Sequence, residues 1–386
     1  MTTMQFRRVE PPDRSDRRGI AAIPPSPGRS DTTLDLAVDD RWPTGGIGTF
    51  ADQVLRGLAT LGHRLDRLGQ HPAGRLASIT PVRPGTVTAG FGRGRSGGRR
   101  RTFFSPGFYP PLQWSGPRVV TVHDLQYLDR AANPSRTRTL YFRHVLLPLI
   151  SRCDLILTVS EESRAALRAE LGRSVPVTIV GNGVDDAFFA AGVGRAPLPD
   201  ADRFRLTYVG NWLPHKRTDL LLRAATRAAR TVPIDLSLPP SPPPEIRAMA
   251  TAAIDNPATD LTVTIRHPLS AAGLADHVAD RDLLVLLSRC EGFGLTPLEA
   301  QAARTPALVA DFDGARRRLG DDGAHFVDLS ADAEEIAWAL VELASDRDRR
   351  RSTVEPGVRN AESHRWSDVI HRVEHALQGV AGGLPG

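Results

Sequence analysis

The chain has little cysteine and, with one exception, no lysine. Its two cysteines, Cys153 and Cys290, lie far apart without the spacing of a disulfide framework or a zinc site, so we expect buried free thiols. No stretch reaches the roughly 18 consecutive apolar residues that a membrane helix needs. The N-terminus is rich in Arg, Asp and Pro and lacks the apolar core of a signal peptide. These absences predict a cytoplasmic globular protein.

The basic residues are almost all of one kind, since 48 of the 49 are arginine and the remaining one is Lys216. Lysine is a compact point charge and arginine a planar fork, so a site that needs one ammonium on a phosphate would not accept arginine in exchange. Chance survival of a single lysine in an arginine-rich chain is the alternative. The segment Tyr208 to Arg217, which holds this lysine, is therefore a candidate phosphate site.

Charge is distributed unevenly along the 386 residues: residues 1–200 carry a net +9 and the remainder a net −4. This split predicts an anionic partner for the first half, such as a membrane surface, an anionic lipid or a polyanionic acceptor. Solvated arginines scattered over the surface are the alternative. The arginine run from Arg93 to Arg101 favours a solvated loop, and without a sequence-reading module beside it we expect no nucleic acid partner.

Apolar segments of strand length alternate with segments of helical spacing, which predicts parallel, doubly wound α/β sheets. The length favours two domains. The expected parts are a disordered leader (1–31), a first domain (32–190), a Gly, Pro and Ala-rich linker (191–202), a second domain (203–362) and a C-terminal segment (363–386). The last segment contains an amphipathic pattern from Trp366 to Leu377, which predicts a final helix.

The segment from Cys290 to Glu299 lies between an apolar run of strand length and a helical pattern, so we predict a loop at the carboxyl end of a strand. Open α/β sheets bind ligands at such loops. Glu291 precedes a Gly-Phe-Gly turn and is expected to point into whatever the loop surrounds. The amides of Gly294 to Thr296, at the start of a helix, can bind a phosphate.

Glu299 has two interpretations that the sequence leaves open. Thr296 and Pro297 precede it as an N-cap and a first helical residue would, so Glu299 fits the last position of a capping box. A ligand contact is the other interpretation.

Two further candidates lie in the first half. Gly46 and Gly48 belong to a glycine-rich loop, predicted from Arg41 to Phe50, that matches neither the dinucleotide nor the Walker spacing, so a tight turn without ligand is the alternative. His123 ends a strand predicted from Arg118 to Val122, where it can donate a hydrogen bond, stabilise charge or act as an acid or base. A structural histidine is the alternative.

Taken in order, these features resemble the family 4 glycosyltransferases, which are retaining enzymes with the GT-B architecture of two facing Rossmann-like domains and a C-terminal helix that crosses back to the first domain. The resemblance covers about residues 34–380 and is most specific from Glu291 to Glu299. Val119 to Leu125 looks most like the bacterial mannosyltransferase branch.

The resemblance implies that Lys216 contacts the donor diphosphate, Glu299 the nucleotide ribose and Glu291 the transferred sugar. It also implies that His123 lies near the reacting carbon and that the loop at Gly46 to Gly48 approaches the phosphates. The remaining donor contacts it implies are main-chain groups of Phe293, Gly294 and Leu295.

The chain departs from the family pattern at several positions. Asn211 stands where an arginine is common, Arg217 replaces the glycine that commonly follows the lysine, and Arg304 replaces a small residue. The stretch Pro239 to Pro244 replaces a glycine-rich turn, and a commonly seen glutamate is missing from Gly314 to Arg317.

These features together predict a retaining transferase that moves a hexose, with mannose as the candidate, from a nucleotide diphosphate sugar to a glycan or lipid-linked acceptor. We expect no cofactor and no metal, although Asp311 and Asp313 resemble the paired aspartates of some metal-dependent sugar transferases. No protein nucleophile is assigned. Contact with an anionic membrane at the inner face is a further expectation. The alternatives are a catalytically weakened scaffold protein and a binder of anionic surfaces.

Overall fold

The computed structural model describes residues 33–39, 46–67, 95–96, 99–111, 114–125, 128, 136–171, 175–194 and 202–382. The expected leader and most of the expected linker lie outside these ranges. From Thr33 onward the chain forms one compact unit.

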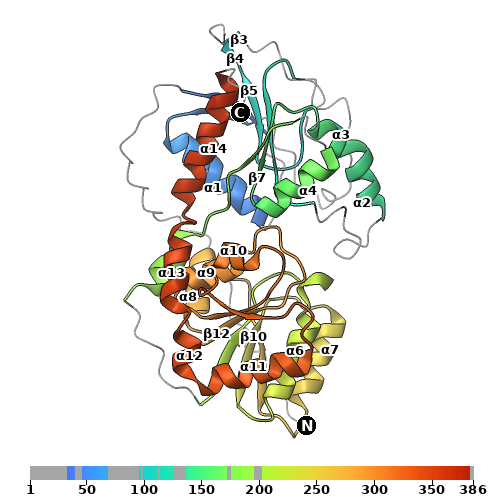
Figure 1. Ribbon diagram of the computed structural model, residues 1–386, viewed down its shortest axis with the longest axis vertical. Coiled ribbons are helices and arrows are strands. Elements are labelled where there is room, and N and C mark those ends of the chain that lie inside the picture. The colour runs from blue at the N-terminus through green and yellow to red at the C-terminus, as the bar shows by residue number, and fades with distance from the viewer. Residues whose placement is uncertain are drawn as a thin grey trace. The chain divides into compact units, whose positions relative to one another are not determined.

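The first sheet is six-stranded and parallel throughout, in the order β2-β1-β5-β6-β7-β8. Figure 1 labels two of these strands, β5 and β7. Its strands are β1 (Asp35–Val38), β2 (Arg64–Arg67), β5 (Thr102–Ser105), β6 (Arg118–Val122), β7 (Leu155–Thr158) and β8 (Val177–Ile179). Its helices are α1 (Gly46–Thr60), α2 (Arg136–Tyr141), the π-helical η1 (Phe142–Leu146), α3 (Leu147–Ile150), α4 (Glu161–Leu171) and α5 (Asp186–Gly192). We call this set the first domain. A separate antiparallel pair joins β3 (Arg95–Ser96) to β4 (Arg99–Arg100).

The second sheet is also six-stranded and parallel, in the order β11-β10-β9-β12-β13-β14. Its strands are β9 (Phe204–Thr207), β10 (Ile234–Leu238), β11 (Leu261–Ile265), β12 (Leu283–Leu286), β13 (Ala307–Ala310) and β14 (His325–Val327). Its helices are η2 (Pro214–Lys216), α6 (Thr218–Ala228), α7 (Pro244–Ile254), α8 (Ala271–Ala279), α9 (Leu295–Ala302), α10 (Ala315–Leu319), α11 (Ala333–Ser345), α12 (Arg347–Arg351) and α13 (Val354–Glu362). We call this set the second domain.

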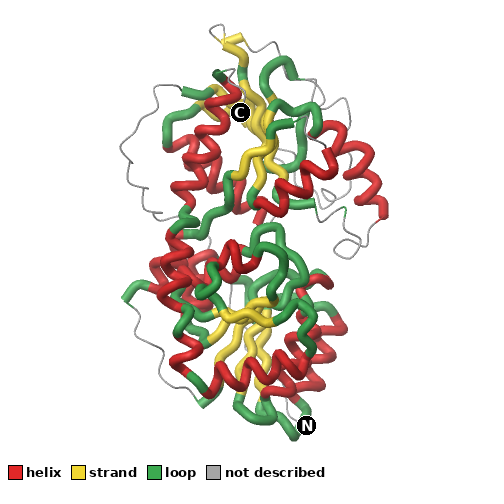
Figure 2. The backbone as a smooth tube through the Cα atoms, viewed as in Figure 1, coloured by secondary structure: helices red, strands yellow, loops and turns green. Residues whose placement is uncertain are grey.

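Strand composition explains why both sheets are parallel and covered on both faces. The central strands β7, β12 and β13 are apolar at nearly every position and buried along their whole length. Parallel strands sit between helices on both faces and therefore carry continuous apolar runs in place of alternation. Figure 2 shows the strands gathered into two groups, each surrounded by helices. The expectation of two doubly wound, Rossmann-like sheets is confirmed.

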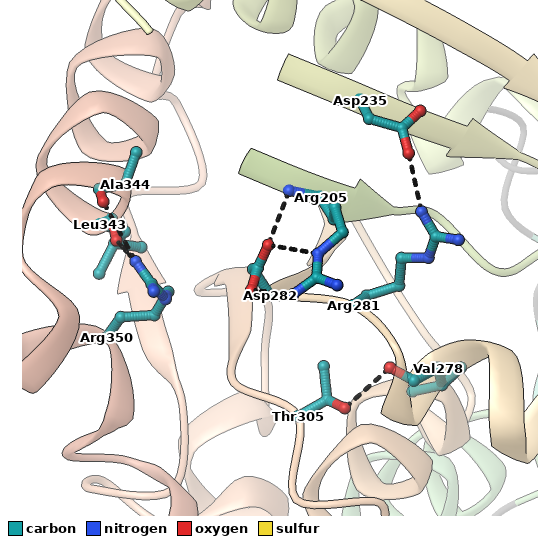
Figure 3. A network of polar contacts seen from close by, with 9 residues as sticks. All are labelled: Arg205, Asp235, Val278, Arg281, Asp282, Thr305, Leu343, Ala344 and Arg350. Carbon is teal, nitrogen blue, oxygen red and sulfur yellow. Dashed lines mark hydrogen bonds and ion pairs between the residues drawn. The ribbon is translucent and has the colours of Figure 1, made fainter. Parts of the chain in front are cut away.

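The amino ends of the second sheet are joined by partly buried charge pairs (Figure 3). Arg205 of β9 donates to both oxygens of Asp282, from Nε at 2.9 Å and from Nη2 at 3.0 Å, and Arg281 donates to Asp235 of β10 at 2.9 Å. Paired Arg and Asp side chains of this kind are strong and geometrically specific. They lie at the edge opposite the carboxyl ends of the strands, so the carboxyl edge is left to bind ligands.

The final helix, α14 (Trp366–Ala381), returns to the first domain and contacts α1, as expected. The contact is close because Gly57 of α1 has no side chain: a Cβ there would lie 2.3 Å from Ile370 Cδ1. His63 and Glu374 add a hydrogen bond of 2.8 Å, and Arg372 Nε donates to the Val180 carbonyl at 2.8 Å. None of the helices in the described ranges is both long and apolar enough to cross a lipid bilayer.

Gly57→Ala is expected to lower the free energy of unfolding by about 1 to 3 kcal/mol, because the added methyl group overlaps a buried, branched side chain. Gly379→Ala on α14 is the matched control. A Cβ at Gly379 meets nothing within 4 Å, so this change should stabilise the protein by up to about 1 kcal/mol. Urea denaturation of both variants checks the pair. Equal effects would show that the α1–α14 contact is not tightly packed.

Candidate functional site

The topology of the second sheet singles out the carboxyl ends of the paired strands β9 and β12. From β9 the chain adds β10 and β11 on one side, and from β12 it adds β13 and β14 on the other. Open α/β sheets bind ligands outside the carboxyl ends of the strands at the point where the strand order reverses. Lys216 ends η2, which follows β9, and Glu291 follows β12, so both lie beside this reversal point.

Lys216 and Glu291 form an ion pair beside this reversal point although 75 positions separate them. The Lys216 ammonium donates to both carboxylate oxygens at 2.7 Å, and the two side chains are only 13% and 9% exposed. Tyr208, which follows β9, is buried, and its hydroxyl donates to the Asn211 carbonyl at 2.5 Å. Burial raises the pKa of Tyr208, so this phenol is neutral at physiological pH.

The loop after Glu291 is shaped by two glycines and one buried ring. Gly294 is left-handed (φ 82°) and is the N-cap of α9, which begins at Leu295. Phe293 is buried, with its ring 5.8 Å from that of His364. The capping-box interpretation of Glu299 is therefore wrong, because the helix starts earlier than Thr296 and its N-cap residue has no capping side chain.

Glu299 lies in the middle of α9 in a partly buried position. Burial, and then the charge of Asp185 from the first domain, raise the pKa of Glu299 from 4.5 to about 7. Its carboxylate makes no hydrogen bond or ion pair with any residue that the structure describes. A partly buried carboxylate without a partner is unusual, since carboxylates in that position are normally paired. Perturbation of this kind is typical of functional sites.

The first sheet reverses its strand order between β1 and β5. Gly46 and Gly48 lie at this reversal point in the first turn of α1. The loop predicted from Arg41 to Phe50 is therefore wrong from Gly46 onward, because the helix starts there, five residues earlier than expected. The preceding residues 40–45 lie outside the described part of the chain. Gly46 is exposed and Gly48 is buried.

His123 follows β6 and is buried between Phe50 of α1, with ring centroids 4.7 Å apart, and Phe108. Its Nε2 lies 3.1 Å from the Pro106 carbonyl oxygen and must donate to it. Burial lowers the pKa of His123 to about 4. The imidazole is therefore neutral at physiological pH, with Nδ1 as a hydrogen-bond acceptor.

Contacts join the carboxyl edges of the two sheets. A Cβ at Gly292 would lie 2.8 Å from Asp124 Oδ2, so the Glu291 loop comes close to the residue after His123. Glu162 of α4 pairs with Arg317 and Arg318 of α10. The structure thus brings the predicted residues of the first domain, around His123, and those of the second domain, around Glu291, to one region. The Glu162 pair was not predicted, although the run of arginines at 316–318 was visible in the sequence.

Arg217 and Arg304, the two arginines that depart from the family pattern, occupy left-handed backbone positions, and their side chains make contacts away from Lys216. Arg217 is left-handed (φ 54°), which explains why glycine suits this position, and it donates to the Leu329 carbonyl at 2.6 Å. Arg304 is also left-handed (φ 61°) at the end of α9 and pairs with Glu355. Neither side chain points at the Lys216–Glu291 pair.

Metal ligation finds no support in the described residues, among which no group of three or more His, Cys, Asp or Glu side chains is placed to hold an ion. Asp311 instead accepts from Arg316 Nε at 2.6 Å. Neither cysteine forms a disulfide, and burial raises the pKa of Cys153 to about 12, which keeps that thiol protonated. Cys290 is only partly buried, contrary to expectation.

Two family profiles match the chain. One, described as Glycosyltransferase Family 4, matches residues 44–188, and the other, described as Glycosyl transferases group 1, matches residues 203–346. The D-inositol 3-phosphate glycosyltransferase of Kineococcus radiotolerans is 29% identical over 66% of this chain and 64% of its own length. That of Kribbella flavida is 23% identical over 83% of this chain and 88% of its own length.

Solved structures share the fold at low sequence identity. Sucrose-phosphate synthase from Thermosynechococcus elongatus has a TM-score of 0.70 at 17% identity and covers 91% of this chain and 100% of its own. The Anabaena protein HepE, solved with UDP and glucose, has a TM-score of 0.62 at 14% identity and covers 89% of this chain and 99% of its own.

Proposed function

We infer that this chain, which belongs to the family 4 and group 1 glycosyltransferases, transfers a hexose with retention of configuration from a nucleotide diphosphate sugar. The observation that carries the proposal is the Lys216–Glu291 pair beside the strand reversal of the second sheet. When a donor binds, the ammonium can bind a phosphate and the carboxylate can accept a hydrogen bond from a sugar hydroxyl. The chain thus has a cation for the leaving phosphate and an anion for the sugar, which are the two ends of the bond that breaks.

The chemistry of donor cleavage requires these groups. Breaking a sugar–diphosphate bond places positive charge on the ring and negative charge on the leaving phosphate, so a fixed cation and amide donors lower the barrier. In the proposal Lys216 and the amides near Gly294 and Leu295 supply these donors, and main-chain groups of Phe293 line the sugar. Gly46 and Gly48 approach the phosphates from the first domain.

The carboxylates then have binding roles. Both oxygens of Glu291 accept from Lys216, which favours a role in orienting sugar hydroxyls over attack on the anomeric carbon. We assign no protein nucleophile, and the leaving phosphate is proposed to take the acceptor proton. Glu299 is proposed to hold the nucleotide ribose.

His123 is proposed as a hydrogen-bond acceptor near the reacting carbon. Its lowered pKa excludes the imidazolium at neutral pH, so it does not act as a general acid there. Its neutral Nδ1 can hold a sugar hydroxyl, and the hydrogen bond from Nε2 to Pro106 fixes that tautomer.

The donor and acceptor classes follow from the relatives and the charge. The solved relative that contains UDP and glucose favours a uridine donor, and mannose from a guanosine donor is the second candidate. A glycan or lipid-linked acceptor is proposed. The names of the curated relatives add a phosphorylated inositol as a soluble alternative. The arginine-rich first half suits either anionic acceptor, and contact with an anionic membrane would serve the lipid-linked one.

A donor screen tests the proposal. Thermal unfolding of the purified protein is measured with UDP-glucose, UDP-GlcNAc and GDP-mannose, because a ligand at 100 times its dissociation constant adds about 2.7 kcal/mol of stability. One donor should raise the midpoint and be hydrolysed or transferred. Stabilisation without any turnover would favour the scaffold alternative. Absence of both binding and turnover with every donor contradicts the proposal.

A further inference from the structure

The chain passes between the two domains twice, and the two passages lie side by side. Val184, just before α5, forms a parallel bridge with Arg365, and the Val184 amide donates to the His364 carbonyl at 2.8 Å. Beyond this bridge α5 contacts α9 of the second domain, while α14 contacts α1 of the first. The covalent joint is thus a pair of adjacent backbone segments, and short segments of this kind are where domains rotate against each other.

Glu162 and two arginines form a second junction between the domains. Glu162 lies in the first turn of α4 and accepts from Arg317 with one carboxylate oxygen and from Arg318 with the other. Gly314 makes room for this carboxylate, because a Cβ at Gly314 would overlap it. The side chain of Arg318 is only 7% exposed, whereas that of Arg317 is 62% exposed. A charge as enclosed as that of Arg318 needs a partner, and the first domain supplies it.

The first-domain side of this junction is tied to the backbone of His123. Ser163 follows Glu162 in α4, and its hydroxyl donates to the His123 carbonyl at 2.9 Å. The Ser163 amide in turn donates to the Ser160 hydroxyl at 3.1 Å. Both serines are buried. The start of α4 and the strand end that carries His123 are therefore held together as one piece.

The second-domain side of the junction packs against the loop that precedes α9. The guanidinium carbon of Arg318 lies 5.5 Å from the centre of the Phe312 ring, and a Cβ at Gly294 would lie 3.3 Å from Cζ of that ring. The Arg318 carbonyl accepts from Asn360 at 2.8 Å, and Asn360 also donates to Gln301 of α9 at 2.8 Å. Arg318 is thus built into the scaffold that carries this loop and α9.

This junction gives a physical reason for one departure from the family pattern. The stretch from Gly314 to Arg317 lacks a glutamate that is common in the family, and its last residue is an arginine. A glutamate in place of Arg317 would put a second carboxylate beside Glu162, whereas the arginine is a counter-ion. Opposite charges across a contact favour one arrangement of the two parts, and like charges disfavour it.

We propose that Glu162 is a positioning residue, whose ion pairs with Arg317 and Arg318 fix the arrangement of the two domains in which His123 meets the Glu291 loop. Without these pairs, rotation at the covalent joint moves the start of α4, and His123 with it, away from the second domain. The inference rests on the proposed function for its effect on turnover. Its effect on the domain arrangement is measured without any donor.

Small-angle X-ray scattering of the purified protein measures the domain arrangement. Glu162→Lys places a third cation against two arginines, so the radius of gyration should increase. The matched control is Glu161→Lys, because Glu161 pairs with Arg164 of its own helix. This control should leave the radius unchanged. A radius in Glu162→Lys equal to that of the parent overturns the inference.

Reversing both charges separates the ion pair from a loss of packing. Arg317→Glu changes an exposed side chain, so the fold should tolerate it, and alone it should also increase the radius because it faces Glu162 with a carboxylate. Glu162→Lys combined with Arg317→Glu restores opposite charges and should return the radius most of the way to the parent value. Effects that simply add in the double variant overturn the inference. In an active enzyme that result leaves the proposed function in place.

Kinetics test the link to turnover. Lys216, Glu291 and Gly294 all lie in the second domain, so Glu162→Gln should keep the donor dissociation constant within about threefold of the parent value. The value of kcat should fall by about 10-fold to 100-fold, because a displacement of about 1 Å between reacting groups can cost that much. A donor affinity that falls as far as kcat would show that Glu162 acts on the donor site itself, which contradicts the positioning role. If no donor is turned over, the proposed function fails and the scattering result alone decides the inference.

Discussion

Lys216→Ala is expected to lower kcat/KM for sugar transfer by about 100-fold to 1000-fold while the protein stays folded. Removing one preorganised donor from a developing anion raises the barrier by about 2.7 to 4 kcal/mol. The structure adds a second reason, because Glu291 is left with an uncompensated charge at 9% exposure. Steady-state kinetics with the donor found in the screen measures the change, and circular dichroism checks the fold.

Two neighbouring variants make this result specific. Arg217→Ala removes the adjacent cation, whose side chain is held by the Leu329 and Ala331 carbonyls, and should keep nearly full activity. Lys216→Arg keeps the charge but replaces a point ammonium with a planar fork, so it should recover only part of the rate. If Lys216→Ala retains activity within a few-fold of the parent, the phosphate role of this lysine is wrong.

The sequence predicted most of the fold because its strands are locally evident. The strand β6 has the bounds that the sequence predicts, Arg118–Val122, and β7, β12 and β13 are apolar at nearly every position. By contrast β5, Thr102–Ser105, was missed, since four residues beside an arginine run give no clear period. Its position becomes evident only from its two parallel neighbours, β1 and β6. Pairing between distant strands is not encoded in a local pattern.

The candidate site was predictable as a set of residues but not as a geometry. Lys216 stood out because the chain has no other lysine, and Glu291 because a glycine turn follows it. Their pairing depends on β9 and β12 being neighbours in the sheet, a relation that no spacing along the chain shows. The same holds for Arg318, whose carboxylate partner Glu162 lies 156 positions away in another domain.

Helix starts were the least predictable local feature, for a physical reason. Thr296, Pro297 and Glu299 satisfy the composition of a capping box, but Gly294 adopts a left-handed conformation and the helix begins directly after it. Glu299 then falls two residues deeper in the helix than a capping glutamate would. This shift removes the local explanation for its carboxylate and leaves a partly buried acid that no described residue binds.

Glu299→Gln is therefore expected to stabilise the protein at high pH and to weaken donor binding. The pKa of Glu299 is raised from 4.5 to about 7, so between these values the folded state binds more protons than the unfolded state. Stability of the parent chain thus falls as pH rises through this window and levels off above it. Glutamine has no charge to desolvate, so its advantage grows from nothing below pH 4.5 to at most about 3 kcal/mol above pH 7. Urea denaturation across this range measures the difference.

The matched control is Glu334→Gln, whose carboxylate is 80% exposed on α11 and should change stability by less than about 0.5 kcal/mol at any pH. Stability should rise and donor affinity should fall in Glu299→Gln. The reason is that a carboxylate whose burial lowers the stability of the fold is expected to contribute to binding. A gain in stability together with weaker binding of the nucleotide sugar supports contact with the ribose. Unchanged affinity for the nucleotide sugar in Glu299→Gln would show that the carboxylate does not contribute to binding and would exclude this residue from the donor site.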